Sequence, residues 1–312
     1  AWNDSGAFAS TGSFSGFGSS QDYGQTWTDG GSFPNGPGPD RNYGDPSLAW
    51  SVRDQAFYYA ALSDLGLSLW RSNDLCRSFT YVGPIHVAGG AEFDDKELIA
   101  IENNPANPRY GRIYVGWTRF GAAPDQNQTT YSDNGGVAWS APVSLPGSGT
   151  NGQGVWPAVA PNGDVYIALL NRSFVVGGLQ DQWIYRSTDG GNSWVKRTDI
   201  ASGQLRPENV AATVNCGRQA LNGNIRNLSS PQIAITRDPS APAGYVIHAT
   251  YPYDSDGAGP DNSNVFYRRS VDGAASWSAE VKLNTDLTST DQWFPALAAA
   301  GPRVRAVVGI GE

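Results

Sequence analysis

The stretch Ser187-Thr188-Asp189-Gly190-Gly191-Asn192-Ser193-Trp194 decides the fold, because the chain repeats it. It has the form Ser-x-Asp-x-Gly-x-x-Trp. Residues 20–27 match this form in full, residues 132–139 have Asn for Asp, and residues 270–277 have Ala for Gly. Residues 72–79 keep only the Ser, the Asp and a terminal aromatic residue. Repetition at this spacing indicates a repeated structural unit.

The chemistry of the motif is that of a tight turn between two strands. A short acidic side chain accepts backbone N–H groups of its own turn, and the Gly supplies a positive φ. The closing Trp is large enough to anchor the turn against a sheet. An alternating run, Trp183-Ile184-Tyr185-Arg186, precedes the copy at 187–194, and a second strand-like run follows it. The motif is therefore expected to join two antiparallel strands, as a structural staple and not as a catalytic site.

The motif resembles the Asp-box, or BNR repeat, of sialidases and many other β-propellers, and the resemblance covers nearly the whole chain. It implies an all-β fold, namely a β-propeller of the sialidase type. No shift in composition divides the chain, so we expect one domain spanning residues 1–312. The resemblance implies six blades as the family default.

The visible repeats give a different count. Each unit reads as four short strands, with the motif between the third and the fourth. The last unit stops after its second strand, residues 303–310, whereas the first begins near its third strand, residues 14–18. We expect these two strands to pair within one shared blade, which gives five blades.

Composition narrows the possible partners and the compartment. The 312 residues carry a net charge of −8, which argues against nucleic acid as a partner. No apolar run is long enough for a membrane span. Four Asn-x-Ser/Thr sequons and the absence of Met suggest a processed, secreted chain. The two cysteines, Cys76 and Cys216, are expected to remain unpaired.

A site is expected where the innermost strands begin, on the side opposite the motif turns. The sialidase resemblance implies a Tyr nucleophile activated by a Glu, together with an Asp acid/base. The candidates for the nucleophile are Tyr251 and Tyr253, with Glu208 as the activating base. Asp45 and Asp95 are the candidates for the acid, although an Asp beside Lys96 is equally compatible with a simple ion pair.

The same resemblance implies an arginine clamp for a sugar carboxylate, because guanidinium binds carboxylate in a bidentate fork. The candidates are Arg41, Arg206, Arg218 and Arg226. Trp156 and Trp293 suit stacking on sugar rings, or packing between blades. The family's Phe/Tyr-Arg-Ile-Pro motif is absent, which puts the clamp in doubt.

The loop 254–261 is a candidate calcium site. Asp254, Asp256 and Asp261 supply oxygen ligands, but Ala258 and Val265 stand where an EF-hand loop has ligands. An exposed acidic turn is the alternative. Beyond this possible structural calcium, no cofactor is required, and two distant histidines make a zinc site improbable.

These features predict a sialidase-like glycoside hydrolase that acts on extracellular glycans by a retaining mechanism. Two alternatives remain open at this stage. The chain could be another glycoside hydrolase or a lyase, or it could be a non-catalytic propeller that binds carbohydrate or protein, because one fold hosts many functions.

Overall fold

The structure is a computed structural model. It describes residues 1–38, 40–121, 126–149, 152–172, 178–207, 220–221, 225, 227–257, 261–286, 288–301 and 303–310. The chain divides into two compact units. Unit 1 comprises Ala1–Leu145 with Gly190–Asn192, and unit 2 comprises Pro146–Asp189 with Ser193–Glu312. The single domain expected over residues 1–312 stays a prediction.

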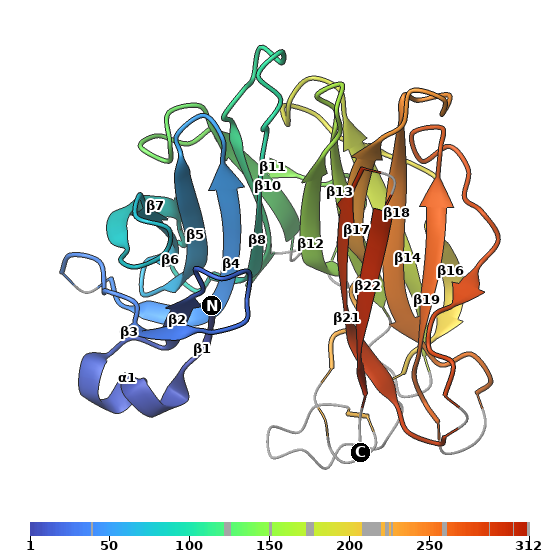
Figure 1. The fold of residues 1–312 in the computed structure, drawn as a ribbon, viewed down its shortest axis with the longest axis horizontal. Coiled ribbons are helices and arrows are strands. Elements are labelled where there is room, and N and C mark those ends of the chain that lie inside the picture. The colour runs from blue at the N-terminus through green and yellow to red at the C-terminus, as the bar shows by residue number, and fades with distance from the viewer. Residues whose placement is uncertain are drawn as a thin grey trace. The chain divides into compact units, whose positions relative to one another are not determined.

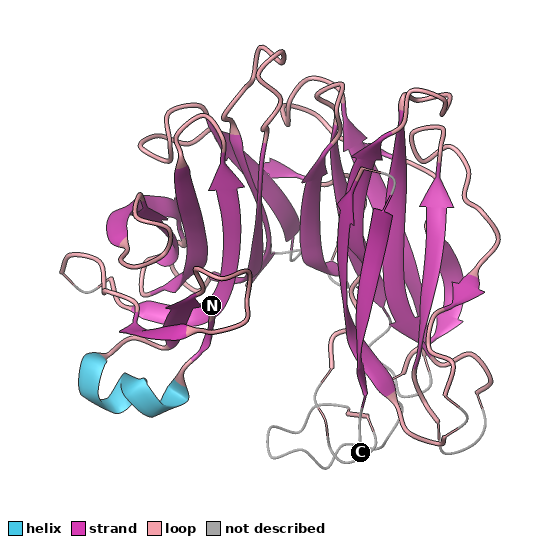
Figure 2. Cartoon of the chain, viewed as in Figure 1, coloured by secondary structure: helices cyan, strands magenta, loops and turns pink. Residues whose placement is uncertain are grey.

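The described residues of unit 1 form three antiparallel sheets and one short helix, α1 (Ser5–Thr11) (Figure 1, Figure 2). The first sheet has the order β1 (Trp2–Asn3), β2 (Ser15–Ser19) and β3 (Thr28–Ser32). The second has β4 (Asn42–Ser51), β5 (Ala56–Ser63), β6 (Gly66–Ser72) and β7 (Thr80–Val87). The third has β8 (Phe93–Ile101), β9 (Ile113–Phe120), β10 (Gln126–Ser132) and β11 (Val143–Ser144).

In unit 2, the residues that the structure describes form three further antiparallel sheets. The first has the order β12 (Gly152–Val159), β13 (Val165–Arg172), β14 (Leu179–Ser187) and β15 (Val195–Lys196), and β16 (Ala201–Leu205) also pairs with β14. The second has β17 (Gln232–Arg237), β18 (Tyr245–Tyr253), β19 (Asn264–Ser270) and β20 (Val281–Lys282). The third pairs β21 (Gln292–Ala300) with β22 (Arg303–Ile310).

The repeated motif forms the turn before the last strand of its sheet, as the sequence predicted. In the copy at 270–277, the Asp272 carboxylate accepts the backbone N–H of Ser276 at 3.0 Å. The Ser270 hydroxyl accepts the N–H of Ala274 at 2.9 Å. Gly273 and Ala274 both have left-handed backbone, with φ of 71° and 62°. The motif is therefore a self-contained turn, which agrees with its expected structural role.

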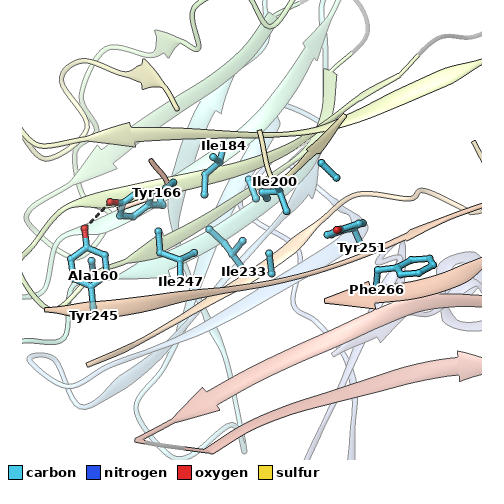
Figure 3. Packing of buried hydrophobic residues seen from close by; sticks show 13 residues of the cluster. Ala160, Tyr166, Ile184, Ile200, Ile233, Tyr245, Ile247, Tyr251 and Phe266 are labelled. Atoms are coloured by element: carbon cyan, nitrogen blue, oxygen red, sulfur yellow. Dashed lines mark hydrogen bonds between the residues drawn. The ribbon is translucent and has the colours of Figure 1, made fainter. Parts of the chain in front are cut away.

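Buried aromatic and aliphatic side chains hold the sheets of each unit together. Figure 3 shows the cluster of unit 2, where Ile184, Ile233 and Ile247 pack between strands. The hydroxyls of Tyr166 and Tyr245 meet at 2.7 Å at one end of this cluster. In unit 1, one such cluster lies among β5, β6, β8 and β9, and a second contains Tyr59 stacked on Phe33.

A bulge recurs in the first strand of four sheets. In each case two residues of the first strand lie opposite one residue of the second strand, and the first of the two has a left-handed backbone. The four pairs are Asp45-Pro46 in β4, Lys96-Glu97 in β8, Gly154-Val155 in β12 and Phe294-Pro295 in β21. Bulges re-aim side chains, so these four positions differ from the remainder of their strands.

The strand pairing expected at the chain ends is corrected in one respect. Residues Ser15 and Gly16 of β2 pair with β1, in the register Asn3↔Ser15 and Trp2↔Gly16. That edge of β2 is therefore taken by β1 and cannot pair with residues 303–310 as expected. The number of blades stays a prediction.

Candidate functional site

The first bulge residues of β4 and β8 form an ion pair in unit 1. The Lys96 Nζ lies 3.0 Å from Asp45 Oδ2, with the two side chains 35% and 20% exposed. The Asn3 Nδ2 donates to Asp45 Oδ1 at 2.9 Å, and the backbone N–H of Asp45 donates back to Asn3 Oδ1 at 2.7 Å. Each Asp45 oxygen thus has a donor, which favours the ionised carboxylate. Lys96 therefore forms an ion pair with Asp45, and the interpretation of Asp95 as its partner stays a prediction.

Glu97 is the second bulge residue of β8, and its carboxyl group differs from that of Asp45 in burial and in hydrogen bonding. It is 1% exposed, and neither carboxyl oxygen has a hydrogen-bond partner on another residue of the described chain. Burial raises the pKa of Glu97 well above its ordinary value, and the Asp45 and Asp95 carboxylates raise it further. Leaving a buried polar group without a partner costs about 1–3 kcal/mol, so a protonated Glu97 calls for an explanation.

The surroundings of Glu97 and Asp45 therefore suit the two carboxyl groups to different roles in a reaction. Burial raises the pKa of Glu97, whereas Asp45 is paired with an ammonium group and accepts a hydrogen bond from an amide. Two carboxyl groups whose surroundings separate their protonation states are the arrangement that general acid and base chemistry needs. Glycoside hydrolysis in most families uses such a pair.

Glu97 was not among the residues singled out in the sequence, although a signal for it exists there. Asp45-Pro46, Lys96-Glu97 and Phe294-Pro295 are each followed by a residue of any type, then Leu or Ile, then Ala. Alignment of these three strands shows a Glu where the other two have Pro. A charged residue in an otherwise apolar repeat position was the available clue.

The two candidate tyrosines are hydrogen-bonded to a glutamate other than the expected Glu208. Tyr251 donates to Glu280 Oε2 at 2.7 Å, and Tyr253 donates to Glu280 Oε1 at 2.6 Å. Glu208 lies outside the described residues. Burial raises the pKa of both tyrosines, and the Glu280 carboxylate raises them further. Tyr251 is fully buried within the core cluster of unit 2, which suits a structural hydroxyl better than an accessible nucleophile (Figure 3).

The two described arginine candidates lie in different units, Arg41 in unit 1 and Arg206 in unit 2, and the clamp stays a prediction. Arg41 Nε lies 2.9 Å from Asp64 Oδ2, and its Nη2 donates to the Tyr43 hydroxyl at 2.8 Å. Arg206 is buried. Arg218 and Arg226 lie outside the described residues, as does Cys216, whereas Cys76 is a free buried thiol as predicted.

The tryptophan candidates both lie in unit 2. The Trp156 indole donates to the backbone carbonyl of Ile233 at 3.1 Å and packs against the core, which favours the packing interpretation. Trp293 stands directly before the bulge of β21, and its buried indole nitrogen has no partner among the described residues.

In the described parts of the acidic loop, the Asp side chains accept hydrogen bonds from nearby backbone N–H groups. Asp254 accepts the N–H groups of Asp256 and Gly257, and Asp261 accepts that of Ser263. Within the part of the chain that the structure describes, no three His, Cys, Asp or Glu residues gather in a metal-binding group. The calcium site at Asp254, Asp256 and Asp261 stays a prediction, which thermal unfolding with calcium or with a chelator tests.

Comparison with known proteins supports the fold. The endo-arabinase of Bacteroides thetaiotaomicron is 12% identical, with 87% of this chain and 94% of that chain covered and a TM-score of 0.50. The α-L-arabinanase of Penicillium chrysogenum, solved with arabinobiose, is 15% identical, with 89% and 75% covered and a TM-score of 0.54. A protein of unknown function from Dyadobacter fermentans is 17% identical, with 95% and 84% covered and a TM-score of 0.50.

At these identities the likeness shows the fold alone, and the chain has the β-propeller fold that its repeats predicted. No family model and no curated protein matches the sequence. Among the described residues, no helix is both long and apolar enough to cross a membrane.

Proposed function

We propose that the chain is a glycoside hydrolase in which Glu97 is the general acid and Asp45 the ionised carboxylate. The observation that carries this proposal is Glu97 itself, a buried carboxyl group whose oxygens have no hydrogen-bond partner on another described residue and whose pKa the paired Asp45 carboxylate raises. Glu97 would protonate the glycosidic oxygen, and Asp45 would act on the opposite side of the sugar ring, as nucleophile or as base toward water. Because Glu97 is 1% exposed, substrate binding must open the bulge enough for the carboxyl group to reach that oxygen.

The substrate class is an extracellular glycan. Two structures of similar fold are named as arabinanases, which makes linear arabinan the first polymer to test. A sialidase reaction at Tyr251 or Tyr253 is the second candidate, and the observation in its favour is the partly exposed Tyr253, which donates to Glu280 Oε1 at 2.6 Å. Hydrolysis of a fluorogenic sialoside tests that candidate, and a non-catalytic glycan-binding propeller remains the outcome if no glycoside is cleaved.

The deciding experiment measures reducing-sugar release from linear arabinan and from a panel of neutral plant and microbial glycans. We expect Glu97→Gln and Asp45→Asn to lower kcat/KM by about a hundred-fold or more. Glu92→Gln is the matched control, because Glu92 precedes the same strand and pairs loosely with Arg119 at 3.7 Å. A Glu97→Gln variant as active as the wild type would overturn the assignment of the acid.

A further inference from the structure

The bulge of β21 presents an aromatic residue at the position where β4 and β8 present their charged pair. Phe294 has a left-handed backbone, with φ of 45°, and it is the first of the two bulge residues, as Asp45 and Lys96 are in their own strands. Its side chain is 50% exposed. A bulky residue in this conformation costs free energy, and such cost is typically retained at functional sites.

The surroundings of Phe294 combine one apolar face with polar groups. The Trp293 ring stands edge-on to Phe294, with 5.0 Å between the ring centroids. The Trp293 indole N–H is buried and has no partner among the described residues. Pro295, the second bulge residue, is buried and fixes the backbone behind the ring. The exposed Phe294 ring, supported by Trp293 and Pro295, presents an aromatic face that matches the C–H face of a sugar.

The segment that leads into β21 is acidic. Asp286 and Asp291 lie in the loop that leads directly into β21. Side-chain hydrogen bonds from Thr288 and Asn284 lower the pKa of Asp286, so it is ionised at neutral pH. The Asp286 carboxylate also accepts the Gln292 side-chain amide at 3.1 Å. A sugar that carries a carboxylate would be repelled here.

We infer that Phe294 and Trp293 form a stacking subsite for an uncharged sugar ring. This inference goes beyond the proposed function: it names uncharged glycans as the ligand class of a site within unit 2, and it excludes sialosides and uronides as ligands there. A hydrophobic contact for another protein is the main competing use of an exposed aromatic residue.

The test is affinity electrophoresis of the full chain in native gels that contain linear arabinan, β-1,4-galactan, inulin, polygalacturonate or polysialic acid. We expect at least one neutral polymer to retard the wild type, and Phe294→Ala to raise its dissociation constant about ten-fold. Phe294→Trp should keep the binding. Tyr23→Ala is the matched control, since Tyr23 is an exposed aromatic residue with a left-handed φ of 60° but lies in a motif turn.

Three results would overturn the inference: wild type retarded by none of the neutral polymers, Phe294→Ala retarded as strongly as wild type, or stronger retardation by the anionic polymers. Circular dichroism of each variant shows that it is folded. The gels measure binding and not catalysis. The stacking site and the proposed hydrolase activity can therefore be contradicted independently. Loss of binding in Phe294→Ala with no hydrolysis by the wild type would support this subsite and contradict the glycosidase.

Discussion

The Lys96 ammonium lies 3.0 Å from the Asp45 carboxylate, and both residues occupy the left-handed first position of a bulge. Their strands, β8 and β4, pack against each other within unit 1. The two bulges thereby bring an ion pair together directly beside the buried Glu97. This relationship explains why two bulky side chains are held in an unfavourable backbone conformation.

Loss of the ion pair should change the pH dependence of the reaction more than the stability. In Lys96→Met, the ionised Asp45 loses its positive partner, so the acid limb of the kcat/KM profile should move to higher pH. The free energy of unfolding should fall by only about 0.5–1 kcal/mol, because the pair is partly exposed. Lys96→Arg, which keeps the charge, should restore the wild-type profile. An unchanged acid limb in Lys96→Met would mean that Asp45 takes no part in the reaction.

Substitution of Glu97 by proline should make the protein more stable and inactive. Pro46 and Pro295 occupy the same bulge position, so the backbone of β8 is compatible with proline. Removal of an unpartnered carboxyl group and of unfolded-state freedom should raise the free energy of unfolding by about 1–2 kcal/mol. Urea denaturation measures this change. A destabilised Glu97→Pro variant would mean that Glu97 supports the fold.

The Tyr251 hydroxyl should matter for stability and little for catalysis. Tyr251→Phe removes the hydrogen bond to Glu280 and should cost about 1 kcal/mol. The rate on glycans should change less than about three-fold, because no step of the proposed reaction uses this hydroxyl. Loss of all activity in Tyr251→Phe, with the fold intact, would favour the retaining sialidase mechanism instead.

A buried histidine should make unit 2 sensitive to mild acid. Burial lowers the pKa of His248 to about 4, and its ring lies 2.9 Å from the Thr236 hydroxyl and 2.7 Å from that of Tyr267. The unfolded chain takes up this proton near pH 6.5. Stability from the neutral ring is therefore complete above pH 6.5 and is lost as the pH falls toward 4.

Between pH 7.5 and pH 5.0, this group should lower the free energy of unfolding by roughly 2 kcal/mol. His248→Gln carries no titrating ring. Its free energy of unfolding should therefore fall by roughly 2 kcal/mol less than that of the wild type over the same pH interval. Urea denaturation at the two pH values provides the comparison. Equal losses in the wild type and in His248→Gln would show that other groups control the acid sensitivity.

The sequence was sufficient for the local structure and insufficient for the site. The motif turns and the strands around them were predictable because their hydrogen bonds are made within a few residues, as between Asp272 and Ser276. The partner of Tyr251 was not predictable. Glu280 comes within hydrogen-bond distance of Tyr251 only because of the register in which β18, β19 and β20 pair.

The bulges were equally hidden in the sequence. A shift of one residue in a strand reverses which side chains face the core. Alignment of the strands marks Glu97 as unusual, but the bulge that buries it follows only from the left-handed backbone of Lys96. The capture of the β2 edge by Trp2–Asn3 depended on pairing between strands that α1 separates in sequence. Such long-range choices are not encoded in any local pattern.

The central claim, that Glu97 is the general acid, is tested most directly by how the rate depends on the leaving group. Glu97→Gln should hydrolyse an alkyl glycoside of the accepted sugar about a hundred-fold or more slowly than wild type, because the departing oxygen must be protonated. The same variant should retain near wild-type activity on the 2,4-dinitrophenyl glycoside, whose leaving group needs no proton, whereas Asp45→Asn should be slow on both. Equal loss on the two substrates in Glu97→Gln would contradict the assignment.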